Sequence, residues 1–376
     1  MNVLFVLHES NFIYGANRSL LELLKAIDFD FDVLIGKSFT KKVDADEIRN
    51  YIGAHLNNIY ICRLPRYRCC YYNKIGIISE WSHYINNIMA FLFSGRRKKI
   101  IKKGNYDFVH LNSIVLFPVI DNYAKYILHV REIFNSDYYN IEKFKEKAIK
   151  ARGIICIDEI TKESLKQYIH EESVFVLNNP FNMLGLENID YEKALKRYGL
   201  SKENTVFALI GQVTEIKGAK FVIQSFMRHF NSKSRLLIVG NYNHSYGREC
   251  QNMAQSDERI IFCGELKDTS EIYRISDYIL RGDSQICIGR TMYEGLYAGA
   301  GIIIPGNTDN MYLFPEKDEF KGKIFFYTAR DENDLANIIE ERSKIKQTNR
   351  ILRCNTEKYV NEYKKYIYKL ANQENV

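Results

Sequence analysis

The stretch from Asp283 to Gly306, DSQICIGRTMYEGLYAGAGIIIPG, combines residue types that suit the binding of a phosphate group. Gly289, Arg290 and Thr291 stand where the pattern predicts the start of a helix. The first turn of a helix presents N–H groups without partners and a partial positive charge, which suit a pyrophosphate. Glu294 follows about one turn later and could accept two hydrogen bonds from a ribose diol. An isolated helical glutamate ordinarily faces solvent, so only this setting makes it a candidate.

Two other loops carry a glycine or a lysine just before a predicted helix. ESNFIYGANRSL places Gly15 there, where a glycine lets a phosphate or a sugar approach the backbone closely. GQVTEIKG places Lys217 beside Gly218, and a flexible ammonium next to free N–H groups is a common way to hold a diphosphate. Taken alone, each feature is more often an ordinary turn. Neither loop has the three-glycine dinucleotide fingerprint, which argues against an NAD-dependent enzyme.

Strands that alternate with helical patterns must position these loops, and the alternation occurs in both halves of the chain. The strands that we predict are Val3–Leu7, FDVLIG, DFVHLNS, YILHVRE and GIICID in the first half, and Val206–Ile210, RLLIVG, RIIFCG and GIIIPG in the second. This alternation favours one parallel sheet per half, with helices on both faces. In such sheets, ligands bind where strands end and helices begin, which is where the candidate loops lie.

The turn VLNNPFN separates the halves, because the strand–helix pattern restarts soon after it. We therefore expect a first domain over residues 1–180 and a second over residues 181–376. The length of 376 residues supports two domains, since it exceeds the size at which a single hydrophobic core keeps growing. From Asp331 onward the tail has helical spacing, and we expect its last helices to pack back on the first domain.

The composition excludes several classes of protein. With 46% hydrophobic and 26% charged residues the chain is of ordinary globular type, neither disordered nor fibrous. It contains no run of 18 apolar residues, and its start, MNVLFVLHES, lacks the features of a signal peptide, so we expect a cytoplasmic protein without a transmembrane helix. The eight cysteines are then expected to be reduced thiols, and their spacing predicts no structural metal.

Positive charge is concentrated between Ile61 and Lys103. This segment holds ten Lys or Arg and one acid, Glu80, so its charge of +9 exceeds the +7 of the whole chain, and aromatic residues are interleaved with the basic ones. Such a mixture suits an anionic membrane surface, with the protein peripheral on it, or a phosphorylated acceptor. A solvated helix with a charged end is an equally open interpretation, whereas no recognition motif supports nucleic acid. The densest basic run is Arg96, Arg97, Lys98 and Lys99.

The stretch from Asp283 to Gly306 also resembles the sugar-nucleotide signature of the family-4 retaining glycosyltransferases of GT-B fold, S-x-x-E-x-F-G-x-x-x-x-E-A-M-A-x-G-x-P-V-I. Further segments resemble other family motifs in the same order: GANRSLLELL, DFVHLNS, LHVRE, ICIDEI, VFVLNNPFN and LIGQVTEIKGAKFVIQSF. The resemblance implies a GT-B fold, in which two Rossmann-like parallel-sheet domains face each other across a cleft. The first domain would bind the acceptor and the second the nucleotide sugar.

The resemblance also implies roles for individual residues and a reaction. The implied contacts are Gly15 with the donor phosphate, His129 with the donor sugar, Lys217 with the diphosphate and Glu294 with the ribose. Arg131 and Glu132 match a local subgroup pattern without an assigned role. The implied enzyme is a hexosyltransferase that moves a sugar, with retention, from a UDP- or GDP-sugar to a glycan or lipid-linked acceptor in surface polysaccharide synthesis. It would need no metal, because Lys217 and helix dipoles would neutralise the phosphates.

Two positions depart from the family pattern. Gln212 stands where the family has an arginine, and Ile286 stands where it has the first of two glutamates. The first change removes a positive charge from the leaving group, and the second removes a carboxylate that would hold a sugar hydroxyl. Arg281 or Arg290 could compensate for the first, and Asp283 for the second. The departures leave open a non-catalytic protein that binds a nucleotide sugar or partners another glycosyltransferase; a sugar-nucleotide epimerase would require a carboxylate cluster that the sequence does not show.

Overall fold

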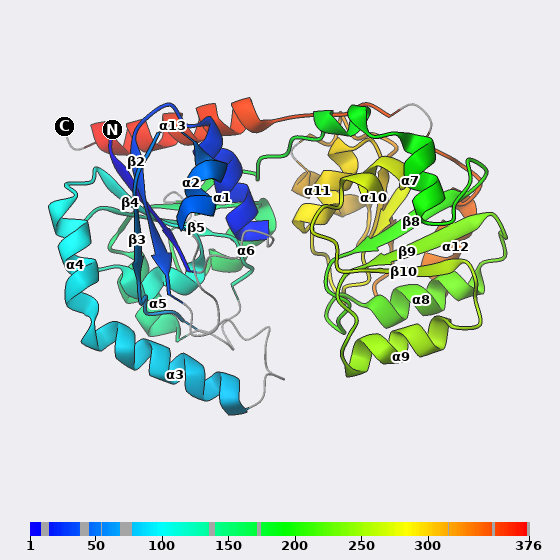
Figure 1. Ribbon diagram of the computed structural model, residues 1–376, viewed down its shortest axis with the longest axis horizontal. Helices are drawn as coiled ribbons and strands as arrows, with labels where there is room; N and C mark the ends of the chain where they lie inside the picture. Colours follow the sequence, from blue (N-terminus) through cyan, green and yellow to red (C-terminus); the bar gives the residue numbers. More distant parts are fainter. Residues whose placement is uncertain are drawn as a thin grey trace. The chain divides into compact units, whose positions relative to one another are not determined.

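The computed structural model describes residues 1–8, 15–37, 45–53, 55–67, 77–134, 140–170, 174–314, 316–347 and 350–373. The chain forms two compact units, whose helices and strands are labelled in Figure 1. Unit 1 comprises Met1–Pro180 together with Thr356–Val376, and unit 2 comprises Phe181–Asn355. The polypeptide therefore leaves unit 1 after Pro180 and returns to it after Asn355.

Unit 1 is built on a parallel sheet of seven strands in the order β3-β2-β1-β4-β5-β6-β7. The strands are β1 (Val3–Leu7), β2 (Phe31–Gly36), β3 (Leu56–Cys62), β4 (Phe108–Leu111), β5 (Tyr126–Val130), β6 (Ala151–Cys156) and β7 (Val174–Val176). The helices are α1 (Gly15–Ala26), α2 (Ala45–Ile52), α3 (Ile77–Leu92), α4 (Ser94–Lys103), α5 (Ile141–Ala148), α6 (Glu159–Leu165) and α13 (Thr356–Asn372), with a 3-10 helix, η2 (Ile114–Val119). In register, Phe5 of β1 pairs with Val33 of β2 and with His110 of β4.

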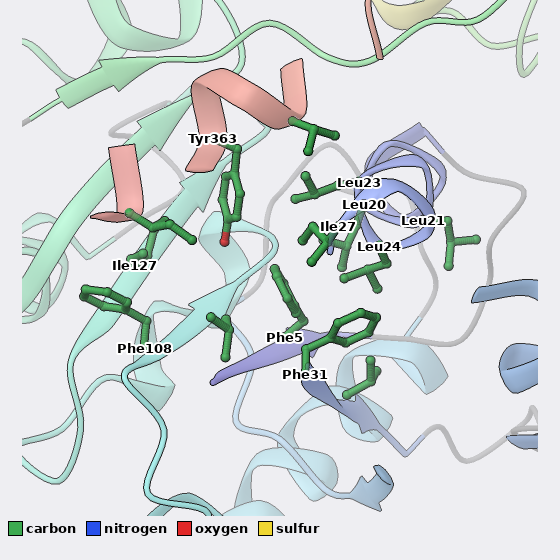
Figure 2. Packing of buried hydrophobic residues seen from close by; sticks show 14 of the residues in the cluster. Phe5, Leu20, Leu21, Leu23, Leu24, Ile27, Phe31, Phe108, Ile127 and Tyr363 are labelled. Atoms are coloured by element: carbon green, nitrogen blue, oxygen red, sulfur yellow. The ribbon is translucent and has the colours of Figure 1, made fainter. Parts of the chain in front are cut away.

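The central strands of unit 1 are buried on both faces, which explains their uninterrupted apolar sequences. Along β1, Phe5 and its alternate neighbours contribute to one core, and Val6 lies in the other. The first core unites α1, the strands and α13, and Figure 2 shows Phe5, Leu24 and Tyr363 converging there. The C-terminal helix is thus part of the hydrophobic core of unit 1.

Unit 2 is built on a second parallel sheet, of six strands in the order β10-β9-β8-β11-β12-β13. The strands are β8 (Thr205–Ile210), β9 (Ser234–Val239), β10 (Ile260–Gly264), β11 (Tyr278–Leu280), β12 (Gly301–Pro305) and β13 (Ile324–Tyr327). The helices are α7 (Tyr191–Arg197), α8 (Ala219–Arg228), α9 (Ser245–Ala254), α10 (Ser270–Ile275), α11 (Arg290–Tyr297) and α12 (Glu332–Arg342), with 3-10 helices η4 (Leu184–Asn188) and η5 (Thr308–Leu313). Its core is formed by residues of β8, β11 and α8, among them Phe207, Leu280 and Phe226.

The prediction of two parallel-sheet domains is confirmed, but four strands were not predicted: β3, β7, β11 and β13. β7 and β11 have three residues each, which is too short to establish a period. β3, with the sequence LNNIYIC, contains two asparagines, a residue type that is depleted in strands. These three strands are recognisable only from their neighbours in the sheet, whereas β13, with the sequence IFFY, has residue types that favour a strand and was simply missed.

The strand order fixes where ligands are expected in each unit. It reverses between β1 and β4 in unit 1 and between β8 and β11 in unit 2. Side chains at the carboxyl ends of these strands border the crevice that such a reversal creates. No helix among the described residues has the length and apolar character needed to cross a bilayer.

Candidate functional site

In unit 2 the loop after β8 is held tightly against the loop after β11. Gly218 is the N-cap of α8 and has a left-handed conformation, with φ of 62°. A Cβ atom at Gly218 would lie 1.7 Å from the carbonyl oxygen of Gly282, so only glycine permits this approach. The contact brings Lys217, predicted to bind a diphosphate, next to the residues that follow β11.

The Lys217 side chain is partly buried and forms no hydrogen bond or ion pair with any described residue. Burial lowers the pKa of its ammonium group, and the positive charge of Arg281 lowers it further, whereas Cys287 and Asp283 act in the opposite direction. A desolvated cation without a counter-ion is unfavourable by itself. The arrangement is therefore suited to an anionic ligand.

Arg281 and Asp283 form a buried ion pair beside Lys217. Arg281 Nε lies 2.6 Å from Asp283 Oδ2, and Arg281 Nη2 lies 2.8 Å from Asp283 Oδ1. Burial opposes the guanidinium charge, but Cys287 and Asp283 outweigh it and raise the pKa of Arg281. A Cβ atom at Gly289 would lie 2.6 Å from Arg281 Nη1, so the guanidinium lies directly against the residue that precedes α11.

The predicted helix start is present: Gly289 is the N-cap of α11, which begins at Arg290. Gly289 provides no side-chain cap, so the first N–H groups of the helix lack a side-chain acceptor. Thr291 Oγ1, in the first turn, is buried without a hydrogen-bond partner from the described ranges. These donors, together with the helix dipole, suit a phosphate oxygen.

Glu294 is not solvent-facing, as an isolated helical glutamate would be; it is 3% exposed. Its Oε2 accepts a hydrogen bond of 2.6 Å from Tyr273 Oη, and its Oε1 accepts one of 2.8 Å from Arg290 Nε. The Arg290 guanidinium also lies over the Phe181 ring, 4.9 Å from its centroid. Tyr273 and Arg290 therefore hold the Glu294 carboxylate in one position.

The two positions that depart from the family pattern differ in their surroundings. Gln212 is exposed in the loop after β8. Ile286 is partly buried, and its Cδ1 would be 3.3 Å from a Cβ atom at Gly306, at the end of β12. Asp283 is occupied by Arg281, so the carboxylate nearest to Ile286 in sequence is already neutralised.

Unit 1 gathers its predicted residues at the switch point between β1 and β4. Gly15 is the first residue of α1, whose first turn is tied to the sheet by a 3.2 Å hydrogen bond from Asn112 Nδ2 to the Ala16 carbonyl. Asn112 Oδ1 accepts from Arg131 Nε at 2.7 Å, at the end of β5. Asn112 therefore links the first turn of α1, which begins at Gly15, to Arg131, the residue that follows strand β5.

Glu132, for which the sequence assigned no role, organises the turn after β4. Its Oε1 accepts a hydrogen bond of 2.7 Å from Ser113 Oγ, and its Oε2 accepts from the Ile114 N–H group at 3.3 Å. Ser113 is in turn the N-cap of η2. Glu132 thus stabilises a helix start.

His129 and His110 are fully buried and in contact. His110 Nε2 lies 3.2 Å from His129 Nδ1, and His110 Nδ1 lies 2.9 Å from Tyr363 Oη of α13. Burial lowers the pKa of His110 to about 3 and holds that of His129 well below its usual value, and the charge of Arg131 adds to both effects. His129 Nε2 is buried and has no hydrogen-bond partner in the described part of the chain. Sequence patterns could not reveal the Tyr363 contact, which spans 253 positions.

The basic run lies on α4, but its four residues are not equivalent. Arg96 and Lys99 are exposed and Lys98 is partly exposed. Arg97 is 7% exposed, so its side chain points into unit 1 rather than outward. Lys98 and Lys102 lie over the Tyr123 ring, with Nζ 5.2 and 4.0 Å from its centroid.

The chain matches no family model and no curated protein sequence. Solved structures nevertheless share its fold. HepE from Anabaena, in complex with UDP and glucose, is similar with a TM-score of 0.71 at 14% identity, over 97% of this chain and 99% of that one. WaaG, a glycosyltransferase involved in lipopolysaccharide biosynthesis, gives 0.61 at 13% identity, over 99% and 98%. A putative UDP-N-acetylglucosamine 2-epimerase from Listeria monocytogenes gives 0.60 at 13%, over 97% and 95%.

Similarity at this level of identity establishes the fold alone. The chain has the GT-B fold, with one parallel-sheet α/β domain in each unit. Since the structures that share it include both glycosyltransferases and a putative epimerase, the fold does not decide the reaction. The function has to be argued from the side chains at the strand ends.

Proposed function

We propose that this protein is a retaining glycosyltransferase that moves a hexose-type sugar from a UDP- or GDP-sugar to a glycan or lipid-linked acceptor in surface polysaccharide synthesis. The observation that carries the proposal is Lys217, a partly buried cation without a partner among the described residues. It interacts electrostatically with Arg281, which lies against the N-cap of α11. The UDP and glucose in the HepE structure support this class of donor.

In the proposed reaction the protein stabilises the leaving diphosphate rather than forming a covalent intermediate. Lys217 and the first N–H groups of α11 would carry the charge that develops as the glycosidic bond breaks. Glu294, held by Tyr273 and Arg290, would accept from the ribose. The acceptor hydroxyl would approach on the side of the departing diphosphate, so that configuration is retained, and no metal is required because the phosphates already meet cationic groups.

The alternative is a protein that binds a nucleotide sugar without turning it over. Two observations favour it. Gln212 is neutral where the family has an arginine, and the ion pair with Arg281 occupies Asp283, the carboxylate that could replace the glutamate missing at Ile286. A charged hydrogen bond contributes roughly 1.5–3 kcal/mol, so each change could lower the rate by one to two orders of magnitude. Binding and turnover must therefore be measured separately.

Donor binding is tested by the thermal shift of the full chain with UDP-, GDP- and CMP-sugars, because a ligand of the folded state raises the melting temperature. Lys217→Gln should weaken binding of the preferred donor by about 10- to 100-fold, the effect of one charged hydrogen bond. Lys220→Gln is the matched control, since Lys220 is exposed in the first turn of α8. Equal affinities for the two variants would exclude Lys217 from the donor site.

Turnover is tested by the release of UDP or GDP with candidate acceptors. Product formation that is lost in both Lys217→Gln and Glu294→Gln supports the transferase. Tight donor binding with no product for any acceptor supports the non-catalytic alternative, and interconversion of the donor sugar would indicate an epimerase.

We also propose that the protein is peripheral on an anionic membrane through a surface formed by α3 and α4. On α3 the large apolar side chains point outward: Trp81, Tyr84, Ile88, Phe91 and Leu92 are each 60–80% exposed. Their positions fall on one helical face. Figure 1 shows α3 at the periphery of unit 1, away from the strands.

The inner side of α3 contains amide side chains, and among its described residues the fully buried apolar one is the small Ala90. An ordinary amphipathic helix instead buries its large apolar side chains. Asn86 Nδ2 donates to the Leu64 carbonyl at 3.0 Å, and Asn87 exchanges two hydrogen bonds of 2.9 Å with the backbone of Arg66. Amide side chains therefore anchor the helix, and packing within unit 1 does not account for its outer aromatic residues. Contiguous exposed apolar surface of this kind marks an interaction site.

The charge next to α3 favours a lipid surface as the partner. From Trp81 to Gly104 the sequence has six Lys or Arg and no acidic residue. A symmetric dimer would bring the same basic surface of two copies together and would be repelled, whereas anionic headgroups attract it. Aromatic side chains beside basic ones suit the boundary between headgroups and acyl chains.

Trp81 is the only tryptophan of the sequence and reports on this surface directly. With vesicles of phosphatidylcholine containing about 30% phosphatidylglycerol we expect its emission to shift to shorter wavelength, and less so with phosphatidylcholine alone. Replacing both Ile88 and Phe91 by serine should weaken binding by about tenfold or more, from the lost apolar burial. Phe230→Ser is the control, since Phe230 is 91% exposed in unit 2.

Two results would exclude the lipid surface. One is wild-type protein that ignores anionic vesicles. The other is a dimer in sedimentation that the Ile88 and Phe91 replacements dissociate, since it would assign the face to a second copy of the chain.

A further inference from the structure

We infer that Arg131, His110 and Tyr363 are positioning residues that hold His129 as the tautomer protonated on Nε2, so that His129 donates a hydrogen bond to an oxygen atom of the ligand. The identity of the ligand rests on the proposed function: it is taken to be a nucleotide sugar or an acceptor. The groups that such a ligand presents are hydroxyl and phosphate oxygens. It assigns a role to Arg131, which the sequence left without one.

Four side chains from three elements form a continuous series of polar contacts. Tyr363 Oη of α13 lies 2.9 Å from His110 Nδ1 of β4. His110 Nε2 lies 3.2 Å from His129 Nδ1 of β5, and Arg131 Nη2 approaches that same Nδ1 atom at 3.4 Å. Figure 2 shows the Tyr363 ring pointing from α13 toward the strands.

Arg131 decides the direction of these hydrogen bonds. A guanidinium group can only donate, so His129 Nδ1 has to be an acceptor, and a neutral His129 ring must carry its proton on Nε2. His110 must then donate through Nε2, which leaves His110 Nδ1 as an acceptor for the Tyr363 hydroxyl. The opposite assignment would direct the N–H group of His129 Nδ1 at the N–H group of Arg131.

Both rings are neutral in this arrangement. The groups that face His129 are Arg131 from its own strand end, His110 from β4 and, through His110, Tyr363 from α13. Complete burial and the Arg131 charge keep the pKa of both histidines below the range in which they would gain a second proton near neutral pH. Arg131 is itself fixed by Asn112 Oδ1 and Asn179 Oδ1, each at 2.7 Å.

This arrangement leaves the Nε2–H group of His129 fully buried and without a partner among the residues that the structure describes. Buried donors are almost always satisfied in folded proteins, so one at a strand end beside the switch point calls for an explanation. A ligand oxygen that accepts from it provides one. The donor is available over a wide pH range, because neither ring titrates near neutrality.

The tautomer is tested in the full chain by nitrogen NMR of labelled histidines, with His129→Gln to assign the signal among the eight histidines. We expect His129 to be protonated on Nε2 alone from pH 6 to pH 9. Arg131→Met should give a mixture of tautomers with the fold retained, as judged by melting. A wild-type His129 protonated on Nδ1 would overturn the inference, and this result does not depend on any donor or acceptor.

The role toward the ligand is tested with the nucleotide sugar that gives the largest thermal shift. Binding should move the His129 Nε2–H signal, and Tyr363→Phe should weaken binding about 3- to 10-fold, as expected for one weakened neutral hydrogen bond. Tyr366→Phe is the control, because Tyr366 lies on the same helix and its hydroxyl contacts the Ile154 carbonyl, at 3.5 Å, and neither histidine. Equal affinities for these two variants, or a ligand that leaves the His129 signal unchanged, would refute the role even if the proposed donor is correct.

Discussion

The strand ends of the two units use different physical means to prepare for a ligand. In unit 2 the groups are ionic: Lys217 lacks a partner among the described residues, and beside it Arg281 and Asp283 neutralise each other. In unit 1 the two histidines at the centre are neutral, the cationic Arg131 lies beside them, and the series of hydrogen bonds ends at His129 Nε2, which has no partner among the described residues. A charged cluster stabilises charge strongly without much directional requirement, whereas a neutral network selects by direction. This difference matches a proposed division in which unit 2 holds a diphosphate and unit 1 contacts hydroxyl groups.

The largest effect is expected from breaking the buried ion pair of unit 2. Asp283→Asn leaves the Arg281 guanidinium buried without its counter-charge, which should lower the free energy of unfolding of unit 2 by about 3–5 kcal/mol. Urea denaturation measures the change. Glu142→Gln is the control, because the Glu142–Lys145 pair is largely exposed and its loss should leave the unfolding midpoint unchanged. A similar midpoint for both variants would show that the Arg281–Asp283 ion pair does not stabilise unit 2.

The second largest effect is expected at low pH, which should destabilise unit 1 more than unit 2, because two fully buried neutral histidines lie in unit 1. Their pKa values are lowered on folding, so the unfolded chain binds more protons below pH 6.5, and the stability present above that pH is lost progressively as the pH falls toward 3. From pH 6.5 to pH 5 the loss should be about 1.7 kcal/mol per histidine, or about 3 kcal/mol for the pair.

Amide hydrogen exchange measures the loss of stability at low pH in each unit separately, with β4 and β5 reporting on unit 1 and β8 on unit 2. Unit 2 contains His229, whose pKa is lowered by burial. Its hydrogen bond to the Phe226 carbonyl and the charges of Glu340 and Asp257 act in the opposite direction, so the acid sensitivity of unit 2 should be smaller. Replacing His110 by glutamine should remove part of the pH dependence of unit 1. Equal acid sensitivity in the two units would contradict the contrast drawn between them.

The smallest effect concerns a neutral group within the ionic cluster. Thr291 Oγ1 has no partner among the described residues, so Thr291→Val should leave the melting temperature almost unchanged. If the hydroxyl donates to a phosphate of the ligand, donor affinity should fall by about 5- to 10-fold, corresponding to one hydrogen bond. Thermal shift with and without donor measures both quantities. Unchanged affinity would restrict phosphate binding to Lys217 and the backbone of α11.

Much of the fold could be predicted because its signals are local. The apolar run of β1 and the amphipathic pattern of α1 specify a strand and a helix within a few residues, and repetition of this pattern specifies two parallel sheets. Gly289 at the start of α11 was likewise predictable, because helix starts have local sequence preferences. By contrast, β11 is a three-residue strand whose identity depends on β8 and β12 beside it.

For the site, the sequence singles out the candidate residues Lys217, Glu294 and His129 by type, spacing and family resemblance. Their partners become visible in the folded protein alone. Tyr273 reaches Glu294 from α10, and Tyr363 reaches His110 across 253 positions of the sequence. The tertiary structure also turned Arg97 inward and the apolar face of α3 outward, against the usual pattern. The physical reason is that the charge, tautomer and exposure of a side chain depend on whichever groups the fold brings within a few ångströms, and sequence spacing does not record that.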